Sequence, residues 1–155
     1  MPQLVKGGKY VFGWSFVHPD GKIMIPPEAR MEYRFIPGDK LIIMNGSKTS
    51  LGFALTNPDL LHNTPFGSMI NKIPEIKHFK ELENGFISFQ KRIFSWTSLD
   101  EDGYIKILPE TLSRYFIIPG DKILAGRGSG LALAFLKQGA IINEAIKHHE
   151  LELFK

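Results

Sequence analysis

The sequence contains the same pattern twice. When the chain is shifted by 82 positions, residues 12–53 align with residues 94–135 without a gap, and 18 of these 42 positions are identical. The shared positions include Phe12 and Trp14, which align with Phe94 and Trp96, and two Pro-Gly-Asp-Lys stretches at 37–40 and 119–122. Identity of this extent predicts two related structural units, and a two-fold repeat is typical of a pseudo-symmetric dimer fused into one chain.

The repeat divides the chain into four segments. Copies at 8–56 and 90–137 would each be marginal alone, so we expect the two repeats to pack into one compact body. Residues 57–86 are expected to form a helical linker, because Asn-Pro and Thr-Pro pairs are typical of helix starts. Residues 138–155 are expected to form a C-terminal helix over 139–149, where apolar residues recur at helical spacing, followed by a tail.

The residue pattern of each copy predicts secondary-structure elements in the order β-β-α-β-β. Strands rich in aromatic and β-branched residues end at Asp20-Gly21 and Asp102-Gly103, and Asp-Gly is typical of a tight hairpin turn. The return strands stop at prolines that suit the first turn of a helix, and a Pro-Gly-Asp turn follows each short helix. Its aspartate is expected to bond local amides. Two apolar strands complete each copy, so the fold class is mainly β with short helices, and the strands should pair with the other copy to cover their edges.

The two tryptophans occupy equivalent positions in the first strand of each copy. Phe12 and Trp14, like Phe94 and Trp96, stand two residues apart, which places both side chains on one face of a strand. We expect these rings to be core residues, buried and related by the pseudo-symmetry. The alternative is an exposed platform on which bases or a flat ligand stack.

Composition excludes several classes of protein. With 43% apolar and 23% charged residues, the chain is typical of a soluble globular protein, and it contains no apolar run long enough to span a membrane. The N-terminal residues do not resemble a signal peptide, and the absence of cysteine excludes disulfides and thiolate metal sites. A cytoplasmic location is therefore expected. The net charge of +3 is compatible with a polyanionic partner but does not by itself indicate one.

No pattern of residues indicates catalysis. Of the five histidines, only His148 and His149 are neighbours, and adjacent residues of a helix point to different faces. Serine, histidine and carboxylate residues do not recur at a spacing typical of an active site. We therefore expect a protein that is not an enzyme and uses no metal and no cofactor.

The best-defined motif is Asp20-Gly-Lys-Ile-Met-Ile-Pro-Pro-Glu-Ala-Arg30 followed by Phe35-Ile-Pro-Gly-Asp-Lys-Leu41. It resembles the SpoVT/AbrB-type swapped-hairpin domain, which also occurs in MazE-like antitoxins, and residues 102–112 with 117–123 form a degenerate second version. The resemblance implies a pseudo-two-fold swapped-hairpin β-barrel. It also implies a prokaryotic transcription regulator that binds duplex DNA through arginines.

The resemblance assigns the DNA contacts to Lys22, Arg30 and Arg34. The equivalent residues of the second copy are Tyr104, Leu112 and Phe116, which departs from the family pattern. Lys106 and Arg114 are basic residues of the second copy at other positions, and we include them as candidate contacts. The alternative is that all five basic residues form a solvated face.

The glycine-rich turns are a second candidate site. Gly46-Ser47 and Arg127-Gly128-Ser129 could expose backbone amides to an anion, with Arg127 adding a charge, although simple hairpin turns are the alternative. These turns support a different hypothesis for function: a barrel of this fold that has lost DNA binding and holds a small ligand or a protein partner. An antitoxin is a third hypothesis, and further homodimerisation stays open.

Overall fold

The structure is a computed structural model that describes residues 3–5 and 9–155, and it is mainly β with short helices. Each copy has the expected element order, β2-β3-α1-β4-β5 and then β7-β8-α5-β9-β10. The strands are β1 Gln3–Val5, β2 Lys9–Phe16, β3 Lys22–Met24, β4 Lys40–Asn45, β5 Phe53–Thr56, β6 Ile87–Phe89, β7 Arg92–Ser98, β8 Tyr104–Lys106, β9 Lys122–Arg127, β10 Leu133–Leu136 and β11 Leu153–Phe154. The helices are α1 Pro27–Tyr33, α2 Pro58–Leu61, α3 Pro65–Ile70, α4 Pro74–Lys77, α5 Pro109–Ser113 and α6 Ala140–Ala145.

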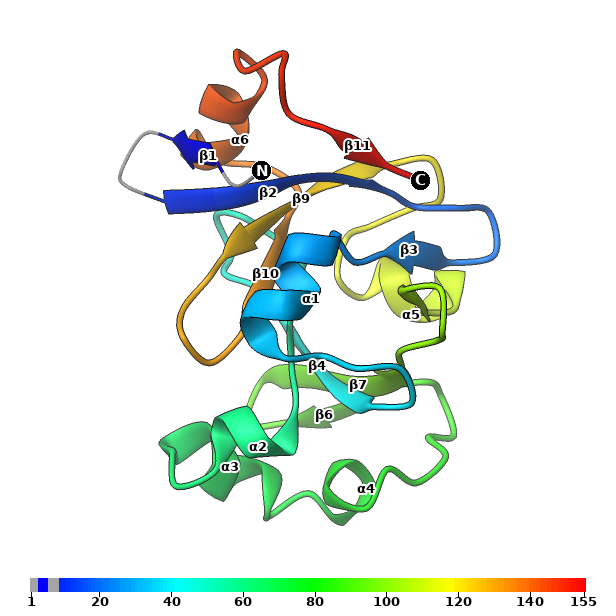
Figure 1. The fold of residues 1–155 in the computed structure, drawn as a ribbon. Coiled ribbons are helices and arrows are strands. Elements are labelled where there is room, and N and C mark those ends of the chain that lie inside the picture. The colour runs from blue at the N-terminus through cyan, green and yellow to red at the C-terminus, as the bar shows by residue number, and fades with distance from the viewer. Residues whose placement is uncertain (1–2, 6–8) are drawn as a thin grey trace.

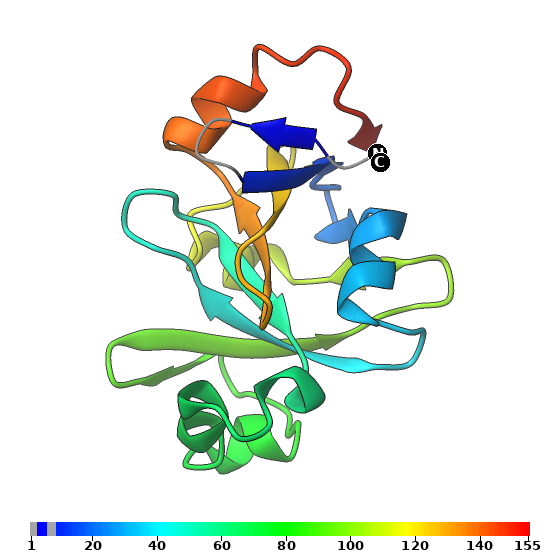
Figure 2. The same ribbon diagram turned by 60° about the vertical axis from the view of Figure 1, so that its left-hand side comes forward.

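Strands of the two copies pair with one another. In the described part of the chain, a nine-stranded sheet has the order β1-β2-β9-β10-β5-β4-β7-β6 with β11 added beside β2, and β3 with β8 forms a separate two-stranded ribbon. The pairs β2–β9, β4–β7, β5–β10 and β3–β8 each join one copy to the other. Figures 1 and 2 show the resulting stack, with α6 and β11 beside β2 at one end and α2, α3 and α4 beside β4, β6 and β7 at the other.

The strand registers define a pseudo-two-fold axis. In the ribbon Ile23 lies opposite Ile105, and in the large sheet Phe53 lies opposite Phe135. Each of these residues faces its own equivalent in the other copy, which happens only where a two-fold axis passes between two antiparallel strands. The Phe53 and Phe135 rings are in contact, with centroids 4.9 Å apart. The central hydrophobic cluster contains residues from both copies and surrounds this axis.

The sheet is not a closed barrel. Its strand order runs from β1 to β6, and these two end strands are not hydrogen-bonded to each other. The expected barrel is therefore corrected to an open, strongly wrapped sheet. The physical reason is that the short strands β1 and β6 each pair with the first strand of a copy and occupy the edges that closure would need.

The Asp-Gly turns form as expected but do not begin hairpins within a copy. Gly21 and Gly103 both have φ of +90°, and the His18 and Asp100 amides bond to the carbonyls of Lys22 and Tyr104. The return strands β3 and β8 then pair with each other instead of with β2 and β7, which corrects the predicted hairpins. Gly21 also lies against the second copy, since a Cβ there would stand 1.8 Å from the Ile107 carbonyl oxygen.

The predicted Pro-Gly-Asp turns and helix caps are confirmed. The carboxylates of Asp39 and Asp121 accept the Ile36 and Ile118 amides at 2.9 and 3.0 Å. In the linker, Asn57 caps α2 by accepting the Leu60 amide at 2.9 Å, and Thr64 caps α3 by accepting the Gly67 amide at 3.1 Å.

A β-bulge changes the faces of the first strand. The ladder between β2 and β9 shifts register between Val11 and Gly13, where Gly13 has φ of +132°. Phe12 consequently packs in the central cluster, whereas Trp14 packs with Val11 under α6. The expectation that both rings share one face is wrong for the first copy. It is right for the second, where Phe94 and Trp96 pack in one cluster against α4.

The tryptophans differ in exposure. Trp14 is buried, but Trp96 is only partly buried and donates its indole N–H to the Lys80 carbonyl at 2.8 Å. The prediction that both rings are buried is therefore correct for Trp14, whereas Trp96 is less buried than predicted. The linker contacts the second ring through Phe79, which lies in edge contact with 5.6 Å between the ring centroids.

The C-terminal segment differs from the prediction. Helix α6 ends at Ala145, several residues before the expected end at His149, and the tail returns as β11. Leu153 and Phe154 pair in parallel with Trp14 and Ser15 of β2. Among the described residues, the structure contains no helix that is long and apolar enough to cross a membrane.

Candidate functional site

Three of the five predicted DNA contacts converge on the β3–β8 ribbon. Lys22 and Lys106 lie directly opposite each other in the ladder. Ile23 and Ile105, the next residues along each strand, are fully buried, so the two lysines occupy the outer face because side chains alternate along a strand. The Lys22 ammonium also lies 4.6 Å from the centre of the Tyr104 ring.

Arg30 joins this surface from α1. Its Nε donates to the Ile25 carbonyl at 3.2 Å, and its guanidinium covers the second copy's turn at Gly103. A Cβ on Gly103 would stand only 2.5 Å from the guanidinium carbon, so the arginine depends on this glycine. Arg30 thus contacts the turn that precedes β8, at the opposite end of the ribbon from the lysine pair.

Arg34 and Arg114 follow the C-terminal ends of α1 and α5. Arg34 is exposed and caps its helix with a left-handed φ of +57°. Arg114 is also exposed, and its guanidinium lies 4.6 Å from the Phe86 ring of the linker. The described contacts of these two arginines do not reach the ribbon.

Acidic side chains balance the ribbon's cations. Asp20, Asp100, Glu101 and Asp102 occupy the two turns beside Lys22, Lys106 and Arg30. The Lys22 amide hydrogen-bonds to the Asp20 carboxylate and, with the charges of Lys106 and Lys22, lowers its pKa. Asp100 likewise accepts the Asp102 and Tyr104 amides at 2.9 Å. The ribbon is a surface of ordered cations among carboxylates and not a basic stripe.

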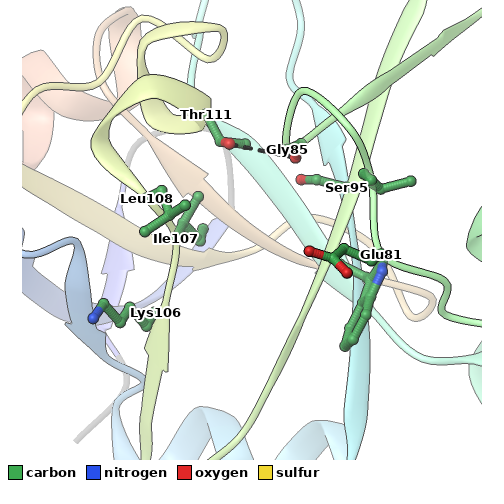
Figure 3. Close-up of a pocket in the computed structure, with 9 residues that line it drawn as sticks. Glu81, Gly85, Ser95, Lys106, Ile107, Leu108 and Thr111 are labelled. Atoms are coloured by element: carbon green, nitrogen blue, oxygen red, sulfur yellow. Dashed lines mark hydrogen bonds between the residues drawn. The ribbon is translucent and has the colours of Figure 1, made fainter.

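A small cavity lies behind Lys106. It measures about 180 Å³ between the linker, β7 and the start of α5. Figure 3 shows Glu81 and Ser95 directed toward this space, while the Lys106 side chain extends away from them. Thr111 donates to the Gly85 carbonyl at 3.3 Å and ties α5 to the linker. Glu81 is the carboxylate that lines the cavity. Lys106 and Ser95 also line it, and the Ser95 hydroxyl is bonded to the Tyr115 hydroxyl at 2.7 Å.

The two Gly-Ser turns have different surroundings. Gly46 and Ser47 line a cavity of about 600 Å³ that Arg114 also lines. Gly128 and Ser129 line a separate cavity of about 210 Å³ beside Arg92 and Phe66. Arg127 is not available to an anion at the second turn, because its guanidinium makes a two-point ion pair with Glu32 and lies 4.4 Å from the Tyr10 ring.

Two residues that line the cavity at the first Gly-Ser turn could not be predicted as site residues from a motif. Lys48 and Phe116 line the 600 Å³ cavity, and neither belongs to a recognisable binding sequence. The alignment of the copies gave one indication that this cavity differs from its counterpart. It pairs Arg114 with Glu32 and Asn45 with Arg127, so the charge is reversed at the first position and removed at the second.

The described residues contain no group of three or more histidine or carboxylate side chains arranged to hold a metal ion. Comparison of the chain with protein-family models, with curated proteins and with solved structures gave no match.

Proposed function

We propose that the protein is a DNA-binding transcription regulator of the SpoVT/AbrB type, acting in the cytoplasm, and that the β3–β8 ribbon is its DNA-contacting surface. The observation that carries the proposal is the convergence of Lys22, Lys106 and Arg30 on this ribbon from three separate elements. Lys22 of the first copy and Lys106 of the second lie opposite each other, and Arg30 contacts the other end of the same ribbon. Guanidinium and ammonium groups on a narrow ribbon are suited to phosphate contacts.

The strand pairing supports the finer fold assignment. In a swapped-hairpin domain each unit completes the sheet of its partner, and here β2 pairs with β9 and β4 with β7 across the copies. We therefore propose a fused, open version of that domain.

The charge of the surface limits the expected affinity. Three cations face four carboxylates, so binding would depend on the placement of the cations instead of on a net positive field. Three phosphate contacts correspond to a slope of about −2.7 in a plot of log affinity against log salt concentration. We expect weak binding at physiological salt, strengthened if the protein dimerises further.

The test is a salt titration with random duplex DNA. In the Lys22→Ala, Lys106→Ala double variant two contacts are lost, and the slope should fall to about −0.9 with a matching loss of affinity. The matched control is Lys72→Ala, Lys147→Ala, which removes two exposed lysines elsewhere and should leave the slope unchanged. Equal effects of the two pairs, or no binding by the unmodified protein at about 50 mM salt, would contradict the proposal.

A ligand-binding module is the second candidate function. The observation that favours it is the cavity of about 600 Å³ at the first Gly-Ser turn, a volume typical of small-molecule sites.

A further inference from the structure

One cavity, larger than four others found in the described part of the chain, lies where the first Gly-Ser turn meets the end of α5. Its volume is about 600 Å³, against 350 Å³ or less for the other cavities. The walls come from both copies, with residues 45–48, 51 and 52 of the first and residues 93 and 113–116 of the second.

The charges around this cavity have one sign. Lys48 and Arg114 are its ionisable cations, and no aspartate or glutamate lines it. Among the described residues, neither cation forms an ion pair. Two exposed cations without a local carboxylate favour an anionic occupant.

At the equivalent place in the other half of the molecule, side chains of the protein join the two walls. Arg127 and Glu32, the equivalents of Asn45 and Arg114, form the two-point ion pair between the copies. Beside them, the Tyr33 hydroxyl donates to the Ser129 carbonyl at 2.7 Å. In that half, a carboxylate and a hydroxyl join α1 to the second Gly-Ser turn.

Neither bond exists at the open cavity. Asn45 accepts the Ile93 amide at 2.9 Å through its side chain, and Tyr115, the equivalent of Tyr33, bonds to Ser95 at 2.7 Å instead of reaching the turn. The repeat therefore has one half in which side chains bridge turn and helix, and one half in which those side-chain bonds are missing and a cation replaces the carboxylate. In the second half the bond from the Gly52 amide to the Tyr115 carbonyl, at 3.2 Å, joins the turn segment to the end of α5.

The remaining walls are apolar. Leu51, Ile93 and Phe116 line the cavity, and Phe116 is 61% exposed although it is a large aromatic residue. Leu51 and Phe116 both hold left-handed φ values, +55° and +64°, which are uncommon for such side chains. An apolar lining with a few polar groups is the usual composition of a site for a small organic molecule.

We propose that this cavity binds a small organic carboxylate with an apolar body. The carboxylate would pair with Arg114 and Lys48, and the apolar body would cover Leu51, Ile93 and Phe116. The bound anion would supply the bridge between turn and helix that Glu32 supplies in the other half. This site is separate from the β3–β8 ribbon and does not depend on the proposed DNA binding.

Octanoate is a suitable probe, with octanol as its uncharged analogue. Titration should give saturable binding by calorimetry and shift the amide resonances of residues 45–52 and 113–116. Arg114→Gln should weaken octanoate binding about ten- to hundredfold, the usual effect of losing one hydrogen bond to a charged group. Lys147→Gln, an exposed lysine on α6's flank, should leave the affinity unchanged.

A second variant tests the repeat argument directly. Asn45→Arg with Arg114→Glu would introduce the ion pair that already exists between Arg127 and Glu32, so it should close the cavity and abolish octanoate binding while the protein stays folded. The proposal is overturned if octanoate does not bind, if octanol binds as tightly, or if both Arg114→Gln and the double variant bind octanoate as the unmodified protein does.

Discussion

Tyr33 and Tyr115 are equivalent residues that the two copies use differently. Both rings are buried, but the Tyr33 hydroxyl bonds to the second Gly-Ser turn and the Tyr115 hydroxyl bonds to Ser95. Burial, with a smaller effect of Glu32, raises the pKa of Tyr33 to about 12, and burial raises the pKa of Tyr115 as well. The two copies therefore differ in the hydrogen-bond partners of single equivalent residues.

Stability should fall at alkaline pH because of these tyrosines. The folded-state pKa of Tyr33 lies above the value of about 10 expected in the unfolded chain, so its contribution is fully present below pH ~10 and is lost as the pH rises toward 12. The shift corresponds to at most about 2–3 kcal/mol, because solvent screens a hydroxyl that is not fully buried. Urea unfolding from neutral pH to pH ~12 should show a smaller decline for Tyr33→Phe. An unchanged decline in Tyr33→Phe would contradict the assignment.

At the scale of elements, the turns and helix caps were predictable, whereas the bulge in β2 and the C-terminal strand β11 were not. The Asp-Gly turns, the Pro-Gly-Asp turns and the caps at Asn57 and Thr64 depend on neighbouring residues, and the sequence indicated each of them. The bulge at Gly13 could not be predicted, because the alternation of apolar residues along a strand does not show where a bulge inserts one extra residue. Strand β11 has only two residues, too few to give a pattern.

The bulge and β11 should depend on each other. A Cβ on Gly13 would stand 2.7 Å from the Glu152 carbonyl oxygen and 2.8 Å from the Phe154 ring, and the residue's φ of +132° disfavours any side chain. Gly13→Ala should therefore displace β11 and break the 2.8 Å bond from the Trp14 amide to the Glu152 carbonyl. Hydrogen exchange at the Trp14 amide should become faster. Gly120→Ala, with φ of +95° and open space around it, is the control, and equal exchange in both variants would contradict the coupling.

At the scale of the whole molecule, the repeat predicted the pairing of copies but not the functional asymmetry. The alignment of the copies implied a shared core, and the registers at Ile23 and Phe53 place an axis through it. The cavity at the first Gly-Ser turn depends on which equivalent residues form bonds across that axis. Those bonds could not be predicted from the sequence. The resemblance supplied candidate cations, but only the pairing of β3 with β8 brought Lys22 beside Lys106.

The two copies should unfold together. The central cluster takes residues from both, and Phe53 and Phe135 meet at its centre, so neither copy keeps a complete core without the other. Trp14 and Trp96 each report on one copy, which makes Trp14→Phe and Trp96→Phe a matched pair of single-tryptophan proteins. Fluorescence of both should give the same urea midpoint as circular dichroism. Phe135→Ala in each background should lower the free energy of unfolding by about 3–5 kcal/mol and move both tryptophan signals equally. Separate midpoints, or a shift confined to the Trp96 signal, would mean that the copies are independent folding units.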